Sequence, residues 1–232
     1  MPKPFVVYFG WTIYVAAAYL CKMTNKPSYK AEERLNTISH ALGILLGVVG
    51  LFLLLDKDAG KTKFSASSIY VYSFSFVLLF SASTAYHSVR SKVLKQRLRV
   101  LDHSSIYVLI AGTYTPLALI TLVNASGWMI FYIVWGIAAL GTIFKIFFTG
   151  KYGIISLLLY LIMGWLVVFD YENVFDYVSP LGLNLLFLGG AFYTIGTIFY
   201  VLKKIPYNHF IWHLFVLGGA ISHWFFIYYG VV

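Results

Sequence analysis

The sequence predicts an all-α integral membrane protein: a bundle of seven transmembrane helices preceded by an extra apolar helix. Of its 232 residues, 60% are hydrophobic and 11% are charged, whereas soluble domains are about half apolar and about a quarter charged. The apolar runs are continuous, which disfavours a membrane barrel of alternating strands. The aromatic content of 19% fits Trp and Tyr anchors at the membrane interfaces. Lipid is therefore the expected solvent.

The N-terminal region divides into two parts, which we separate as residues 1–30 from a seven-helix domain at residues 31–232. Residues 5–21 are apolar over about one helix and lack a small-residue cleavage pattern, so a cleaved signal peptide is not favoured. An extra span, an interfacial helix and an uncleaved signal-like segment all fit. Residues 22–34 form a basic, polar connector. The single cysteine, Cys21, excludes an internal disulfide and a cysteine-based zinc site.

Seven longer apolar runs follow the connector. They lie near 37–55, 65–89, 103–123, 128–148, 153–169, 179–202 and 208–230. Pro116 should kink the third run, Ser179 and Pro180 should open the sixth as cap and first-turn proline, and Asn208 should cap the seventh. Glycines should mark close helix contacts in several runs: Gly43 and Gly47, Gly136 and Gly141, Gly189 and Gly190, Gly218 and Gly219.

Basic residues predict the orientation of the bundle. With seven spans, thirteen Lys and Arg fall on the side of the connector, and three fall on the other side with an acidic loop. The positive-inside rule places the first side in the cytoplasm, so the C-terminus is expected outside and the protein in the plasma membrane. The net charge of +9 is then explained by cytoplasmic loops, and no nucleic-acid partner is expected. The thirteen are Lys22, Lys26, Lys30, Arg34, Arg90, Lys92, Lys95, Arg97, Arg99, Lys145, Lys151, Lys203 and Lys204.

Polar residues converge at the cytoplasmic ends of four predicted spans. His209 and His213 are four residues apart and share one face of the last helix. His87 ends the second span, with Ser83 one turn deeper, and Asp102 opens the third. Ionisable residues at membrane depth are costly and usually functional. We therefore expect these side chains to form one site.

Three neutral imidazoles from His87, His209 and His213 suit a zinc ion whose fourth position is open to water, the pattern of catalytic zinc. Asp102 could act as general base or orient a ligand histidine. Ser83 could donate a hydrogen bond to a carbonyl oxygen as negative charge develops. Such a site would lie within reach of membrane lipids, with a fatty acid or an acyl amide as ligand.

Four segments together are similar to one known family: residues 33–40, 83–87, 101–107 and 209–213. They resemble the hemolysin III family, the bacterial branch of the progestin and adipoQ receptors. This branch belongs to a wider group of proposed membrane hydrolases that includes the alkaline ceramidases. The resemblance covers about residue 30 to the end. It implies a seven-helix fold with a cytoplasmic N-terminus and zinc held by His87, His209 and His213, beside Asp102 and Ser83.

Other polar residues near these segments fit structural roles better. Helix packing is favoured for His40 and Glu33, and His103 should point away from its neighbour Asp102. His223 lies ten residues beyond His213, roughly 15 Å deeper, and is expected to be a buried hydrogen bonder or an interfacial ring.

Three functions remain open at this point. The first is a zinc-dependent hydrolase of a lipid amide or ester, with a role in membrane lipid homeostasis. The second is a sensor or regulator of membrane state in which zinc is structural. The third, a pore-forming hemolysin, is disfavoured because a secreted pore former must first be soluble. The substrate and the oligomeric state do not follow from the sequence.

Overall fold

The computed structural model describes residues 29–232, and the expected apolar helix at 5–21 lies outside them. The described chain is helical, and seven of its helices are long and apolar enough to cross a membrane. The prediction of a seven-helix membrane bundle is confirmed. The helices are α2 (Tyr29–Lys57), α3 (Ser65–Ser88), α4 (Lys92–Pro116) with η1 (Leu117–Thr121), α5 (Gly127–Phe148), α6 (Gly153–Gly164) with η2 (Leu166–Asp170) and α7 (Tyr171–Tyr177), α8 (Pro180–Val201), and α9 (Asn208–Phe226) with η3 (Ile227–Val231).

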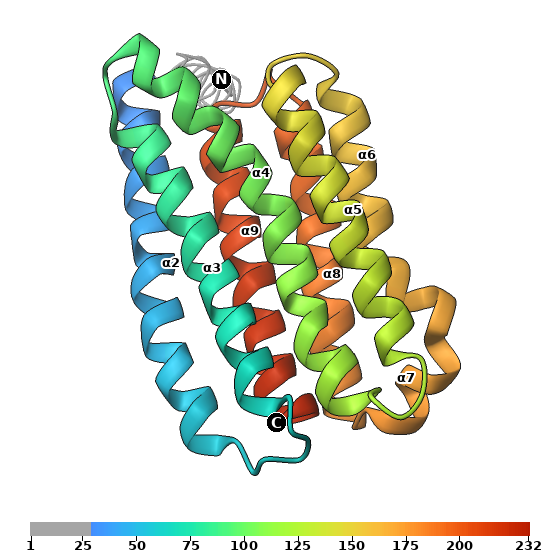
Figure 1. Ribbon diagram of the computed structural model, residues 1–232. Helices are drawn as coiled ribbons and strands as arrows, with labels where there is room; N and C mark the ends of the chain where they lie inside the picture. The colour runs from blue at the N-terminus through green and yellow to red at the C-terminus, as the bar shows by residue number, and fades with distance from the viewer. Residues whose placement is uncertain (1–28) are drawn as a thin grey trace, which may run out of the picture.

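The helices run up and down, so that alternate connections lie at the same end of the bundle (Figure 1). The start of α2 and the connections α3–α4, α5–α6 and α8–α9 share one end, and the C-terminus lies at the other. We call the first the basic end, because it carries the basic segments that predict the cytoplasmic side.

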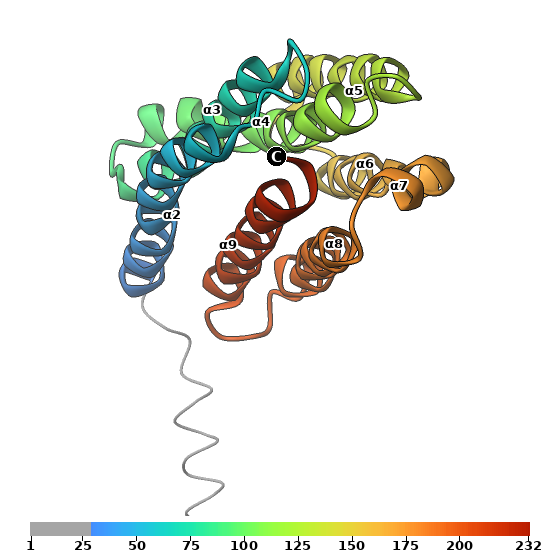
Figure 2. The same cartoon turned by 90° about the horizontal axis from the view of Figure 1, so that it is seen from below.

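Seen along the bundle, the helices surround the inner face of α9 (Figure 2). Helix α9 packs between α2 and α8, while α3 packs between α2 and α4 in the upper part of the view. Helix α5 lies outside α4, and α6 stands between α5 and α8. This arrangement brings α2, α3, α4 and α9 together at the basic end, where the sequence places the candidate site.

Most of the glycines that were expected to mark close helix contacts do lie where two helices pack closely. A Cβ on Gly43 of α2 would stand 2.3 Å from the Phe80 ring of α3, and one on Gly47 would stand 2.6 Å from Phe76. Glycine therefore lets these two helices approach closely. Gly136 is the exception, because a Cβ there would meet nothing within 4 Å.

Several helix ends differ from the apolar runs. Helix α2 begins at Tyr29 and α4 at Lys92, both well before the runs they contain. Ser91 caps α4 by accepting a hydrogen bond from the Leu94 amide at 3.5 Å. Polar and basic residues continue a helix beyond the hydrocarbon without raising hydropathy, so an apolar window does not detect them.

The expected terminus signals have mixed outcomes. At Pro116, α4 gives way to the π-helical turn η1, and Ser179 caps α8 by accepting from the Gly182 amide at 3.1 Å. The expectation that Asn208 caps α9 is wrong. Tyr207, in the left-handed region with φ 56°, is the N-cap. Asn208 is the first helical residue. Its side-chain amide donates a hydrogen bond to the Phe199 carbonyl at 3.0 Å, which links α9 to the end of α8.

Candidate metal centre

Three histidines meet at the basic end, one from α3 and two from α9. One nitrogen of each of His87, His209 and His213 lies within 4.8 Å of those of the other two. The centroid of the His87 ring is 5.2 Å from that of His209 and 4.8 Å from that of His213. His209 and His213 are 4.7 Å apart by the same measure, as expected one turn apart on one helix face. This geometry can hold one metal ion.

Two nitrogens in this cluster have no hydrogen-bond partner among residues 29–232. They are Nε2 of His87 and Nδ1 of His213, and both are buried. Buried polar atoms are nearly always paired, because leaving one unpaired costs about 1–3 kcal/mol. A metal cation would accept the lone pairs of neutral imidazoles and remove this cost. The cluster therefore fits a resident metal ion, and imidazole donors suit zinc, copper, iron and nickel.

Glu33 of α2 sets the orientation of the His87 ring. Its Oε1 lies 3.4 Å from Nδ1 of His87, and its other oxygen accepts a short hydrogen bond from the Lys95 ammonium of α4. The side-chain nitrogen of Asn36 also lies 3.5 Å from this Nδ1. An ionised carboxylate can only accept, so a proton on Nδ1 of His87 would let the ring donate to Glu33. The lone pair would then be on Nε2, the buried nitrogen without a hydrogen-bond partner. A carboxylate behind a histidine in this way fixes the ring and its tautomer for a metal.

The neighbouring Glu32 holds the start of α9. The cap residue Tyr207 offers no side-chain bond, and the His209 amide instead donates to Oε1 of Glu32 at 3.2 Å. A carboxylate at a helix N-terminus is favoured by the helix dipole. Burial lowers the pKa of Lys203 in the α8–α9 connection, and the charge of the Glu32 carboxylate partly opposes this shift. Helix α2 therefore positions ligand candidates on both α3 and α9.

His40 of α2 packs against the cluster through its ring. Its ring stacks on that of His213, with centroids 3.7 Å apart and planes 17° apart, and it meets Phe80 edge-on at 4.9 Å. Both its ring nitrogens are buried and lack a hydrogen-bond partner in the described chain. The packing role expected for His40 matches these contacts.

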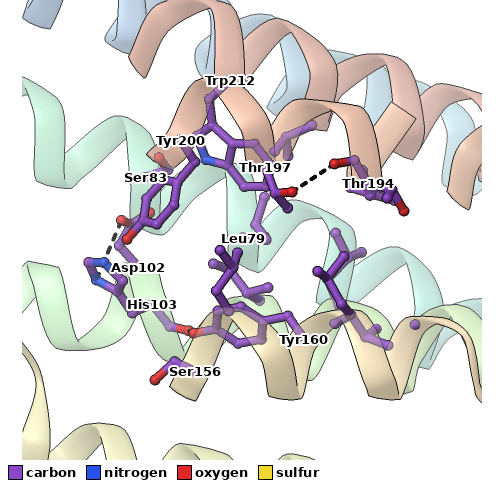
Figure 3. A pocket seen from close by; sticks show the side chains of 18 of the residues that line it. Leu79, Ser83, Asp102, His103, Ser156, Tyr160, Thr194, Thr197, Tyr200 and Trp212 are labelled. Carbon is purple, nitrogen blue, oxygen red and sulfur yellow. Dashed lines mark hydrogen bonds and ion pairs between the residues drawn. The ribbon is translucent and has the colours of Figure 1, made fainter. Parts of the chain in front are cut away.

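A cavity beside the histidines is lined mainly by apolar and aromatic side chains (Figure 3). Ser83 of α3 and Asp102 of α4 both line it, together with His209 and His213. Ser83 is buried. The Asp102 carboxylate lies 4.0 Å from Nδ1 of His103, which donates to the Arg99 carbonyl at 2.7 Å.

The structure thus groups His87, His209 and His213 in one cluster, and Ser83 and Asp102 line a cavity together with two of these histidines, His209 and His213. Their roles as ligands and as acid–base groups remain predictions. His223 lies apart from the cluster, and its Nε2 is 3.1 Å from the Leu186 carbonyl. What the sequence analysis missed is the support of His87 by Glu33 and Lys95. The spacing of Glu33 and His40 along α2 was the signal available, and it did not show that Glu33 faces α3.

Comparison with known proteins places these features in a wider group. A family model described as Haemolysin-III related matches residues 28–224. A protein named Hemolysin-3 homolog from Bacillus subtilis (strain 168) is 43% identical over 195 residues, covering 84% of this chain and 92% of its own length. Hemolysin-3 from Bacillus cereus is 41% identical over 205 residues, covering 88% and 94%. The human Monocyte to macrophage differentiation factor is 33% identical over 210 residues, covering 85% and 83%.

Proposed function

Because this chain belongs to the haemolysin-III related family, a family of multi-pass membrane proteins, we propose that it binds zinc and hydrolyses an acyl amide or ester of membrane lipids. The observation that carries this proposal is the cluster of His87, His209 and His213, two of which have a buried nitrogen without a hydrogen-bond partner in the described chain. Such a reaction would serve membrane lipid homeostasis in the plasma membrane.

The three histidines would hold the zinc ion, with His87 kept in the required tautomer by Glu33. Zinc bound there supplies Lewis-acid polarisation of a carbonyl and makes water more acidic. The protein must then place a substrate carbonyl and a proton acceptor next to the cluster. The cavity beside the histidines offers both an apolar wall for an acyl chain and two polar groups.

Asp102 is suited to take a proton from the attacking water, since a carboxylate facing the cavity can act as general base. Ser83 is suited to donate a hydrogen bond to the carbonyl oxygen as charge builds on it. The water oxygen bonds to the acyl carbon, the carbon–nitrogen bond breaks, and the amine leaves with a proton held until then by Asp102. The products are a fatty acid and an amine; an ester would give a fatty acid and an alcohol.

Hydrolysis in ¹⁸O-labelled water tests this proposal. Purified protein in lipid nanodiscs is supplied with lipid amides and esters, and the products are read by mass spectrometry. We expect a fatty acid carrying one ¹⁸O atom, formed by wild type and by Lys151→Met, an exposed change outside the cavity. His209→Ala should form none. Zinc-loaded protein without turnover on any of these lipids would contradict the proposal.

The main alternative is a membrane-state sensor in which zinc is structural and joins α3 to α9. It predicts that zinc raises stability while no lipid is consumed, so the same samples separate the two functions. The curated bacterial relatives carry the name hemolysin. Efficient dye release from liposomes by added protein would favour a pore-forming activity instead.

A further inference from the structure

Lys145, in the last turn of α5 at the basic end, is a buried cation that the metal centre does not explain. Only 3% of the residue is exposed, and its side chain lines the same cavity as His209, His213 and Asp102. Lysine is almost never buried without a partner. Its ammonium nevertheless makes no hydrogen bond or ion pair with any residue between 29 and 232.

The charges near Lys145 increase this deficit. The charge that acts on it most is Arg99 of α4, another cation. Arg99 is held near the α5–α6 connection, where its Nη1 lies 3.3 Å from the place a Cβ of Gly150 would occupy. The carboxylate that shares the cavity, Asp102, faces His103 at 4.0 Å and makes no ion pair with Lys145. Lys145 therefore has no counter-ion among the residues that the structure describes.

The Lys145 ammonium nitrogen is not among the fully enclosed atoms without a partner, so it keeps some accessible surface although the residue as a whole is buried. An ammonium in such a poorly solvated position is normally paired with an anion. An anion that enters the cavity would pair with Lys145 and gain from the field of Arg99. Ser156 of α6 also lines the cavity (Figure 3). Its hydroxyl donates a long hydrogen bond, 3.5 Å, to the Tyr152 carbonyl and also interacts with the Tyr107 side chain. Rotation away from the carbonyl would let it donate to an anion.

The rest of the cavity wall restricts the class of that anion. Leucines and aromatic rings from α4, α6 and α8 form most of the wall, so a small hydrated ion would gain little there. An amphiphile would place its acyl chain on this wall and its anionic group on Lys145. Two histidines of the cluster, His209 and His213, line the same cavity.

We propose that Lys145, supported by Ser156 and the charge of Arg99, is an anion-binding subsite that selects lipids whose polar part carries a carboxylate or a phosphate. The inference rests on the proposed function in one respect only: the lipid that carries the carboxylate or phosphate is taken to be an acyl amide or ester. Neutral acyl amides should enter the same cavity but bind more weakly. Lys145 is therefore a specificity-determining residue.

Binding without turnover tests this inference separately from hydrolysis. Chelator-treated protein in phosphatidylcholine nanodiscs is titrated with N-lauroylglycine, with its neutral analogue N-lauroylethanolamine, and with dodecyl phosphate. Binding is followed by the fluorescence of Trp165 and Trp212, which line the cavity. The measured quantity is the ratio of the neutral to the anionic Kd, compared between variants so that differences in membrane partitioning cancel.

We expect wild type and Lys145→Arg to favour an anionic probe by about 10- to 100-fold, the range of a hydrogen bond to a charged group. Lys145→Met should lose this preference, while Lys151→Met, on the exposed surface nearby, should keep it. The apparent Tm of Lys145→Met should be unchanged or higher, because the lysine has no partner to lose. A purely structural lysine would lower Tm without changing the ratio.

Preference for one of the two anionic probes supports the subsite and shows whether carboxylate or phosphate is the natural group. The inference is overturned if Lys145→Met keeps the wild-type ratio, or if Lys151→Met loses the preference equally. Hydrolysis of neutral and anionic amides at equal rates would also overturn it and leave the proposed function standing. Charge-selective binding without hydrolysis would support the anion-binding subsite and contradict the proposed hydrolase function.

Discussion

Replacing Glu33 by Gln tests how the bundle prepares His87 for a metal. The substitution keeps the shape of the side chain but removes its charge, and with it the ion pair to Lys95. Loss of such a carboxylate behind a metal-binding histidine typically weakens metal binding by about 10- to 100-fold. The contact to His87 is long, 3.4 Å, and the Glu33 side chain is 18% exposed. We therefore expect the lower end of that range, about tenfold, which corresponds to about 1.4 kcal/mol.

The assay is competition for zinc between purified protein and a chromophoric chelator. Glu33→Gln should still bind one zinc ion per chain at saturation, but with a Kd about tenfold higher. His87→Ala, which removes a candidate ligand, should lose tight binding altogether. The matched control is Glu172→Gln, which changes an exposed carboxylate in α7 and should leave the Kd unchanged. A Kd for Glu33→Gln within threefold of wild type would refute the role assigned to Glu33.

Three further predictions concern packing, metal removal and orientation. Gly43→Ala should destabilise the bundle by about 1–3 kcal/mol and lower the apparent Tm, because its Cβ would lie 2.3 Å from the Phe80 ring. Gly136→Ala, with open space around its Cβ, should leave the apparent Tm unchanged. Equal effects of the two variants would contradict the close packing of α2 on α3. Free zinc at 100 times its Kd should stabilise the protein by about 2.7 kcal/mol. A chelator should therefore lower the apparent Tm of wild type and of His223→Gln, but not that of His213→Ala. If the chelator leaves the apparent Tm of wild type unchanged, the protein holds no resident metal. In a Cys21→Ser background, Lys203→Cys should react with an impermeant thiol reagent only from the cytoplasmic side and Glu172→Cys only from outside; the reverse labelling would invert the assigned orientation.

The fold was predictable because lipid imposes a strong composition on spanning helices. Continuous apolar runs predicted the number of spans, which the structure confirms. The orientation inferred from the unequal distribution of Lys and Arg stays a prediction. Helix ends were less predictable. The polar starts of α2 and α4 are helical but not apolar, and Asn208 lies inside α9 rather than at its cap.

The three histidines of the candidate metal centre were predictable from the sequence, but the side chains that pack against them were not. The spacing of His209 and His213 places both rings on one face of a helix, and topology brings His87 to the same depth. Which side chain of α2 faces α3 depends on the rotation and approach of two helices, which one sequence does not show. The contact of Glu33 with His87, the stacking of His40 on His213 and the burial of Lys145 all depend on such packing.

Metal content of the purified protein tests the central claim most directly. Elemental analysis of wild type should find one zinc ion per chain, retained in His223→Gln, whose ring lies outside the cluster. His87→Ala and His213→Ala, each folded as judged by gel filtration, should contain almost none. Wild type without bound metal, or zinc that remains at full occupancy in both variants, would contradict a metal centre built from α3 and α9.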